Sequence, residues 1–546
     1  MADRRHAGIL AVLLLLAGGL ALATPVGPGS ARLFGVSLLW WYCAAVAPLL
    51  SLLVAFVTLP TPPARLAASL SPVLVATLVA RVFAGAPEAP LLILAAATAP
   101  LLGSLVGPLP GRRDGFAAVA GLASSGLLVW AGLSLAGDLA LALGRERWHG
   151  VGLAAAVALV GSLRCVGRLQ AGLLAAGLVI LAAPVLLLSA RGVAPWHAWA
   201  AVASRPALLF GENAAAANEG LVLRVATAVD FDEAHRVTAL SPAVYRVVER
   251  DGDVPAVREW RLKPGDALML RPGDRLELAA GVRVRFEAGK RIPGAAVSGV
   301  AWADPIDRDH AVTFDVAAAA LTLAAGTAAL SAGRRAGRST RGSGWARAAA
   351  LALPVVSALL AACWGVYAAH AAPELGLGAP SVAALAGLPA GLPGALLPAV
   401  AVVAVLAALA ALFAANVSAL GGRVVYRARG RNRSRLPLVW TAMILFAAGF
   451  ALPAFDAWRA LTWGWGLAAA TLVTPVLATE RATVHRAAAV VGALVFASLA
   501  IGGRALAPWA PVVADYPALV ALPAAWALAA ALGRRLPARR VVRASR

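Results

Sequence analysis

The sequence predicts a polytopic α-helical membrane protein of about 14 transmembrane helices, with one small antiparallel all-β domain inserted after the seventh helix. Three observations predict this class. Of the 546 residues, 61% are hydrophobic and only 14% are charged, whereas soluble proteins carry about 25% charged residues. Many apolar runs approach the length of roughly 20 residues that a helix needs to cross a bilayer. One stretch between these runs is polar and alternates as β-strands do.

Fourteen apolar segments are long enough, or nearly so, to span the hydrocarbon core. We expect them near residues 7–25, 34–58, 66–83, 90–108, 116–142, 150–163, 170–190, 311–332, 348–369, 396–419, 436–453, 457–478, 486–503 and 515–532. They divide the chain into a first transmembrane block (1–204), an extracytoplasmic β domain (205–310), a second transmembrane block (311–533) and a basic cytoplasmic tail (534–546). The first segment also fits a signal peptide, with Ala21-Leu22-Ala23 as its cleavage site.

The charge distribution predicts the orientation. Residues 205–310 carry 15 basic and 16 acidic side chains, whereas the rest of the chain carries 33 basic and 10 acidic ones. The excess bases lie in alternate short connections and in the C-terminal tail, where the positive-inside rule places them. We therefore expect both termini in the cytoplasm, the polar insert outside the inner membrane, and the net charge of +22 to reflect topology rather than nucleic-acid binding.

The insert reads as β structure that contains two nearly identical turns. Lys263-Pro-Gly-Asp266 and Arg271-Pro-Gly-Asp274 stand eight residues apart, and leucines follow each. Proline presets φ at the second position of a turn, and glycine supplies the positive φ of the third. The turn residues are Pro264, Gly265, Asp266, Pro272, Gly273 and Asp274. We expect a small meander, barrel or sandwich without disulfides, because none of the three cysteines lies in the insert.

Ionisable residues inside a membrane mark candidate sites for transport. Asp138, Asp315 and Asp456 map toward the outer ends of their segments, and we interpret them as candidates for a polar substrate path. Pro184 and Pro354 are expected to interrupt their helices, as happens in transporters. The tryptophans, Trp40 and Trp199 among them, lie near segment ends and predict an aromatic belt at the lipid interface.

The histidines support an alternative. His149, His197, His310 and His370 map to the outer membrane surface, and neutral imidazole is a common ligand of haem iron. This arrangement resembles polytopic haem-handling proteins of cytochrome c assembly, which combine outward histidines with a tryptophan-rich WGxxWxWD loop. The nearest match is Thr462-Trp463-Gly464-Trp465-Gly466, which lacks the terminal aspartate. The resemblance implies a haem-handling or electron-transfer membrane protein.

Motifs for nucleotide hydrolysis, GxSxG hydrolases and HExxH metalloproteases do not occur in the chain. We therefore expect a non-enzymatic membrane protein without a cofactor, of the transporter, flippase or envelope-assembly kind. Its β domain would dock an envelope protein or gate a path. A further alternative is a membrane scaffold subunit of a larger complex.

Overall fold

The computed structural model describes about three fifths of the chain. The described residues are 2–58, 77–79, 81–83, 85, 88–106, 115–142, 146–163, 182, 185–186, 189–190, 192–205, 209–210, 220–223, 227–249, 256–279, 281–291, 293, 298–304, 306–307, 311–331, 344–371, 457–473, 482–506 and 510–535. Within them, six helices are long and apolar enough to cross a membrane: Arg4–Leu22, Leu38–Thr58, Glu88–Val106, Ala311–Ala329, Leu351–His370 and Arg486–Gly503. These helices indicate a membrane-embedded protein.

The longer described helices follow the predicted apolar segments closely. The described helical elements are α1 (Ala2–Leu22), η1 (Pro28–Ser30), α2 (Leu38–Trp41), the π-helical η2 (Tyr42–Val46), α3 (Ala47–Thr58), α5 (Glu88–Val106), α6 (Gly115–Ala142), α7 (Arg147–Leu163), α9 (Pro195–Ala203), α10 (Gly299–Trp302), α11 (Ala311–Ser331), α12 (Gly344–Ala371), α16 (Ala457–Ala468), the π-helical η4 (Ala469–Val473), α18 (Ala482–Leu506), α19 (Pro511–Asp515) and α20 (Ala518–Arg535). The short elements η1, α9 and α10 lie outside the predicted segments, and α19 lies almost wholly before the last of them. The predicted segments 396–419 and 436–453, and most of 66–83 and 170–190, lie outside the described residues.

Helix α5 is the centre of the helical part. In its apolar window 89% of the residues are buried, against 17% for α1 at the periphery. Small residues allow close approach: a Cβ on Gly103 would lie 2.3 Å from the Ala324 carbonyl oxygen of α11. The Thr98 hydroxyl is satisfied by donating to the Leu94 carbonyl at 2.7 Å. A helix buried on all sides thus contacts its neighbours without leaving that polar group unpaired.

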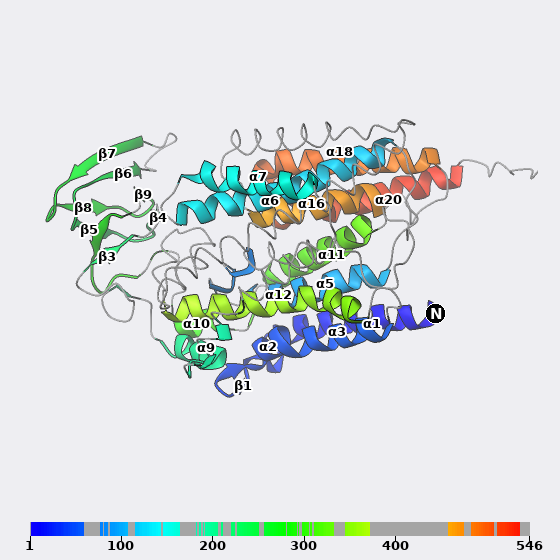
Figure 1. The fold of residues 1–546 in the computed structure, drawn as a ribbon, viewed down its shortest axis with the longest axis horizontal. Coiled ribbons are helices and arrows are strands. Elements are labelled where there is room, and N and C mark those ends of the chain that lie inside the picture. Colours follow the sequence, from blue (N-terminus) through cyan, green and yellow to red (C-terminus); the bar gives the residue numbers. More distant parts are fainter. Residues whose placement is uncertain are drawn as a thin grey trace, which may run out of the picture.

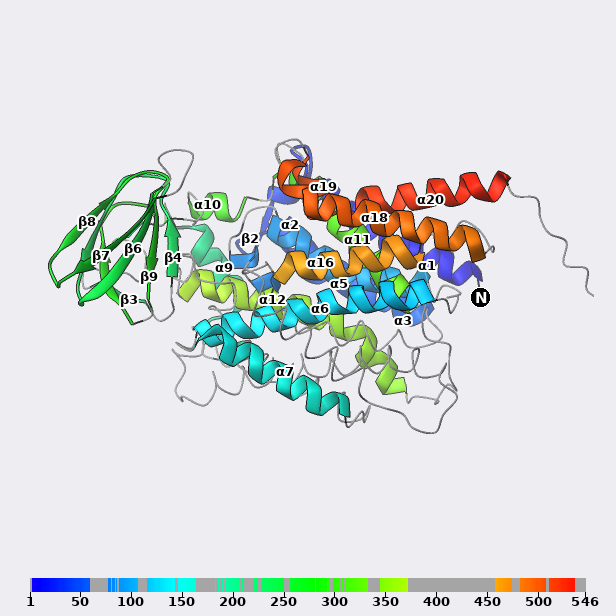
Figure 2. The same cartoon turned by 90° about the horizontal axis from the view of Figure 1, so that it is seen from above.

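The helices run roughly side by side, and the β-sheets lie together at one end of them (Figure 1). The N-terminus and the end of α20 lie at the opposite end, and a view from above shows the same separation (Figure 2). Helices α9 and α10 stand where the chain enters and leaves the β region.

The β region contains two four-stranded antiparallel sheets, with strand orders β3-β10-β5-β8 and β4-β9-β6-β7. The strands are β3 (Leu221–Val222), β4 (Thr227–Asp230), β5 (His235–Ala239), β6 (Ala243–Glu249), β7 (Ala256–Leu262), β8 (Ala267–Leu270), β9 (Arg275–Leu278) and β10 (Arg283–Phe286); a separate pair, β1 (Arg32–Leu33) and β2 (Val36–Ser37), joins η1 to α2. Pairing is nested: β6 with β7, β5 with β8, β4 with β9 and β3 with β10. A long hairpin folded over itself in this way is a jelly-roll sandwich, so the meander and barrel alternatives are wrong.

Four glycines set this nested pairing. Gly265, Gly273, Gly281 and Gly289 stand eight residues apart and have φ of +97°, +93°, +85° and +79°. Each glycine N–H donates to the carbonyl of a residue on the opposite side of the long hairpin. The N–H of that opposite residue donates to the carbonyl of the residue that follows the glycine. The opposite residues are, in the same order, Ala239, Phe231, Leu223 and Phe210. Two residues therefore face one at each point, which is a glycine β-bulge that bends the hairpin.

The two aspartates of the PGD turns complete their own turns. The Asp266 carboxylate accepts the Lys263 N–H at 2.7 Å, and the Asp274 carboxylate accepts the Arg271 N–H at 2.8 Å. Asp266 is exposed, whereas Asp274 is only 7% exposed. Their role in the structure is to close the turns.

The sandwich core takes side chains from both sheets, including Tyr245, Leu276 and Val284, which are all buried. At the base of the domain, Trp40 and Trp199 are 3% and 2% exposed. Trp40 stacks on Trp302, and Trp199 meets Trp40 edge to face. The prediction that these two tryptophans belong to a lipid-facing belt is therefore wrong, since they pack against each other at the junction with the β domain.

Candidate functional site

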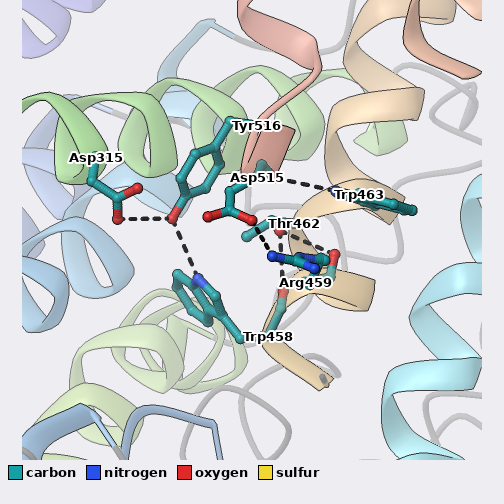
Figure 3. A network of polar contacts seen from close by, with 7 residues as sticks. All are labelled: Asp315, Trp458, Arg459, Thr462, Trp463, Asp515 and Tyr516. Carbon is teal, nitrogen blue, oxygen red and sulfur yellow. Dashed lines mark hydrogen bonds and ion pairs between the residues drawn. The ribbon is translucent and has the colours of Figure 1, made fainter. Parts of the chain in front are cut away.

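A network of polar side chains joins three parts of the helical region (Figure 3). Asp315 lies near the start of α11, and Trp458 and Arg459 lie in the first turn of α16. Asp515 ends α19, and Tyr516 follows it. Pro511 begins α19, which is only five residues long. This short helix places Asp515 and Tyr516 against the other two elements before α20 begins.

Two hydrogen bonds connect the buried members. The Tyr516 hydroxyl donates to Asp315 Oδ2 at 3.3 Å, and Trp458 Nε1 donates to the Tyr516 oxygen at 3.3 Å. Tyr516 and Trp458 are 3% and 5% exposed, and Asp315 is half-buried. The tyrosine hydroxyl is the donor in this contact, and the Asp315 carboxylate is the acceptor.

The charges around Asp315 do not balance. Arg459 pairs with Asp515, and Arg81 pairs with Glu88 at 3.1 Å. Among the residues that the structure describes, Asp315 forms no ion pair of its own, and its side chain accepts only the tyrosine hydroxyl. Among the described residues, these three acids and two arginines leave one negative charge in excess, and Asp315 is the acid for which no ion pair is found there. A partly buried carboxylate in this situation has a strong demand for a cation.

The face of α11 that carries Asp315 continues as a seam against α16. Thr322 and Gly326 follow Asp315 by seven and eleven residues, so all three lie within about 40° of one another around the helix. A Cβ on Gly326 would lie 2.6 Å from the Cβ of Trp465 and 2.7 Å from its carbonyl oxygen. The backbones of α11 and α16 therefore touch at this point, about three helical turns along α11 from Asp315.

Polar atoms in this seam are buried without a partner in the described part of the chain. They are the Thr322 hydroxyl and the Trp465 indole nitrogen, whose residues are each 1% exposed. Hydroxyls of other buried helices, such as those of Ser124 and Ser357, donate to the carbonyl four residues earlier. The hydroxyl of Thr327, also on α11, has no such bond either. Buried polar groups left unpaired commonly mark a functional path or a water site.

The other acids proposed for a substrate path are not placed with Asp315. Asp138 belongs to α6, but the position of its side chain is outside the description, and Asp456 lies outside the described residues. Pro184 is likewise outside them. Pro354 lies inside α12, which continues as one helix from Gly344 to Ala371. The prediction of an interruption at Pro354 is therefore wrong. Packed membrane helices can accommodate a proline, which has no backbone N–H to donate, without breaking.

The histidines considered as haem ligands have separate surroundings. His149 is exposed and stacks on Trp148, with ring centroids 3.7 Å apart, and His197 is exposed. His370 is half-buried, and Arg205 Nη2 lies 3.5 Å from its Nδ1. His310 lies outside the described residues. Across the described ranges, no three side chains of histidine, cysteine, aspartate or glutamate gather closely enough to hold a metal ion.

The Thr462–Gly466 motif lies within α16 and not in a loop. Its Trp463 Nε1 donates to the Asp515 carbonyl at 3.2 Å, and its Thr462 hydroxyl donates to the Trp458 carbonyl at 3.1 Å. This motif therefore supports the network around Asp315.

Two acids of the sequence Val229–His235 pair with arginines, and the third accepts a backbone N–H. Asp230 lies 3.7 Å from Arg275, and Asp232 pairs with Arg291. Glu233 accepts the Arg291 N–H at 3.0 Å. These contacts favour a structural role for the acids at one end of the sandwich over cation binding.

Sequence reasoning identified Asp315 but missed its partners. Tyr516 is 201 residues away in the chain, and no local pattern links the two. The available signal was the polar pair Asp515-Tyr516 beside Pro517 in an otherwise apolar stretch. No protein-family model matches this chain, and no curated protein matches it.

Proposed function

We propose that this protein is a multi-pass membrane transporter or flippase in which Asp315 binds the cation that drives transport. The observation that carries the proposal is the unbalanced carboxylate: within the described part of the chain, Asp515 and Glu88 each have an arginine partner, and Asp315 has only the Tyr516 hydroxyl. Intramembrane acids that lack a fixed partner are typical of ion-coupled transport. A carboxylate that binds and releases a cation gives the protein a cation-bound state and a cation-free state.

The proton is the cation that best suits this site. Hard metal cations such as Ca²⁺ take about six to eight oxygen ligands, whereas the described surroundings of Asp315 supply its own carboxylate and one hydroxyl. Protonation removes the excess charge without any further ligand. It also weakens the hydrogen bond from Tyr516, because a neutral carboxyl is a poorer acceptor than a carboxylate. Proton binding would therefore loosen the contact between α11 and the start of α20.

The proposed topology has about 14 spans, both termini in the cytoplasm and the β domain outside the inner membrane, where it docks an envelope protein. Its support is the alternation of arginine-rich connections, together with the position of the sheets opposite the N-terminus and the end of α20 (Figure 1). A membrane-impermeant maleimide would label Met269→Cys, at an exposed position of β8, in intact cells if this orientation holds. Labelling only after permeabilisation would reverse it.

Transport is tested with the full-length protein in proteoliposomes that contain a pH-sensitive dye and are offered mixtures of small solutes and lipids. We expect proton uptake that depends on one of these substrates in the wild type. Asp315→Asn should abolish this coupled uptake, Asp315→Glu should retain part of it, and Tyr516→Phe should shift its pH dependence. Asp266→Asn makes the same charge change on an exposed turn and is the control.

Full coupled uptake by Asp315→Asn, with Asp266→Asn unchanged, would contradict the role of the carboxylate. Absence of any movement of protons or substrate in the wild type would contradict the transporter itself.

A further inference from the structure

Strand β7 is a long, open edge of the β domain. It pairs with β6 through all seven of its residues, and it stands last in the order β4-β9-β6-β7. Six of its seven residues are exposed, and Leu262 is half-buried. Its sequence, Ala-Val-Arg-Glu-Trp-Arg-Leu, contains no proline or glycine. An exposed edge of this length presents a row of backbone groups that can pair with another strand.

The alternation of the antiparallel ladder shows which groups face the open edge. The Phe231 N–H donates to the Asp274 carbonyl, so the even-numbered residues of β9 turn their backbone groups toward β4. The odd-numbered residues of β9 then face β6, and the odd-numbered residues of β6 face β7. Trp260 pairs with Tyr245 and therefore faces β6. The N–H and C=O groups of residues 257, 259 and 261 consequently point outward.

We propose that two copies of this chain pair antiparallel through β7, with Trp260 on the two-fold axis. A two-fold axis perpendicular to a sheet passes through one residue of each strand, so the choice of residue sets the register. Centring on Arg258 or Arg261 would oppose two arginines, and centring on Glu259 would oppose two glutamates. Centring on Trp260 opposes Glu259 of each copy to Arg261 of the other. This is the register with two opposite-charge pairs and no like-charge pair at its centre.

The unsatisfied groups of β7 match this register. Glu259 and Arg261 form no ion pair with another described residue, whereas Arg258 and Arg246 on the same sheet lie 3.4 and 3.2 Å from glutamates. Trp260 is 42% exposed although its partner Tyr245 is fully buried. At the centre of the pairing, the two Trp260 residues form a pair without mutual backbone bonds, where side chains approach most closely. Each ring would cover the exposed part of the other.

The outward backbone groups also fit. Residues 259 and 261 of one copy would exchange N–H···O=C bonds with residues 261 and 259 of the other. The contact is small, so the pairing belongs to the weak, reversible class. Confinement of both chains to membranes raises their effective concentration and favours it. The proposal stands independently of the transport function, because it uses no residue of the helical part.

Disulfide crosslinking of the full-length chain in membranes tests the register. In a background with the three native cysteines replaced by alanine, Trp260→Cys should form a disulfide-linked dimer on mild oxidation. Val257→Cys is the matched control, since it is exposed on the same strand but lies about 20 Å from its counterpart in this register. Equal crosslinking at the two positions, or none at position 260, would overturn the proposal.

Charge reversal supplies a second measurement that does not depend on folding of one variant. Glu259→Arg and Arg261→Glu, each combined with Trp260→Cys, should each lower the dimer yield by about three- to tenfold. The two variants mixed in one membrane should crosslink to each other at the wild-type level, because both cross-strand pairs regain opposite charges. Failure of the mixture to recover would overturn the register.

Vesicles also distinguish where the two copies reside. Crosslinking without vesicle clustering would place them in one bilayer, and crosslinking with clustering would place them in facing bilayers. Both results keep the β7 pairing.

Discussion

The two PGD turns form a matched pair that separates the effect of burial from that of turn chemistry. Asp266 and Asp274 make the same hydrogen bond to the backbone N–H three residues earlier, at 2.7 and 2.8 Å. Asp266 is exposed and Asp274 is 7% exposed. Replacing each with alanine removes the same interaction from two different environments.

The expected magnitudes follow from what becomes of the freed N–H. At position 266 water can replace the carboxylate, so Asp266→Ala should lower the free energy of unfolding by about 0.7 kcal/mol. At position 274 the Arg271 N–H is part-buried and loses a charged acceptor. The loss there should be about 2 kcal/mol, in the range for hydrogen bonds to charged groups. A free-energy loss of 1.4 kcal/mol corresponds to a tenfold change in an equilibrium.

Hydrogen exchange measures this difference in the full-length protein in detergent. Amides of β6 and β9, read by mass spectrometry, should exchange about 3-fold faster in Asp266→Ala and about 30-fold faster in Asp274→Ala. Equal acceleration in the two variants would refute the argument that burial decides the strength of this bond. Unchanged exchange in both would show that the aspartates contribute nothing to the sandwich.

Three further predictions concern other buried groups. His235 is fully buried, and burial lowers the pKa of its imidazole. As the pH falls, the unfolded chain therefore takes up a proton at this position first, near pH 6.5. The β domain should lose stability between pH 7 and pH 5, by up to about 1.4 kcal/mol per pH unit. His235→Phe should flatten this slope in hydrogen exchange, and an unchanged slope would assign it to other groups. Gly326→Ala should lower the melting temperature, because the new Cβ would lie 2.7 and 2.8 Å from the carbonyl oxygen and the Cα of Trp465. Gly502→Ala is the control: no atom lies within 4 Å of its Cβ, so the melting temperature should stay unchanged or rise. Arg205→Ala removes the donor to the His370 carbonyl at 2.7 Å. It should destabilise the protein by about 1–3 kcal/mol in thermal unfolding. An unchanged stability would mean that water replaces the guanidinium.

Local chemistry in the sequence predicted local structure well. The PGD units predict positive φ at Gly265 and Gly273, and both glycines have it. The same eight-residue spacing continues to Gly281 and Gly289, which lack the preceding proline that makes the first two turns recognisable in the sequence. The nested pairing was beyond sequence reasoning, because Phe210 bonds to Lys290, 80 residues away. Turn residues determine where a strand bends, but not which distant strand it meets.

The candidate site shows the same limit. Asp315 stands out because a carboxylate in an apolar helix is expensive. Its significance depends on Tyr516 and on the two arginines that neutralise the neighbouring acids, and none of these is close to it in sequence. Trp40 illustrates the opposite error. Its position at a segment end predicts a lipid-facing residue, yet Trp199 and Trp302 bury it.

The contacts at the base of the β domain determine which helices can respond to it. Arg205, at the entry, donates to the Ala369 and His370 carbonyls at the end of α12. Gly299, at the exit, donates its N–H to the Arg205 carbonyl, so entry and exit are held together. A Cβ on Gly299 would lie 2.0 Å from the Val202 carbonyl oxygen, which leaves no room for the two segments to separate while they remain packed.

The exit then continues directly into α11. The Asp307 carboxylate accepts the Thr313 N–H at 2.7 Å, and the Asp307 N–H donates to the Ala23 carbonyl at 2.9 Å. The helix that carries Asp315 is therefore anchored, two residues before that carboxylate, by a residue of the segment that leaves the β domain. A partner or second copy that shifts the β domain would act on α11 and α12 before it acts on α16. If binding at β7 influences Asp315, Asp307→Ala should weaken that influence without changing Trp260→Cys crosslinking, because the Asp307 anchor of α11 and the β7 edge are separate parts of the chain.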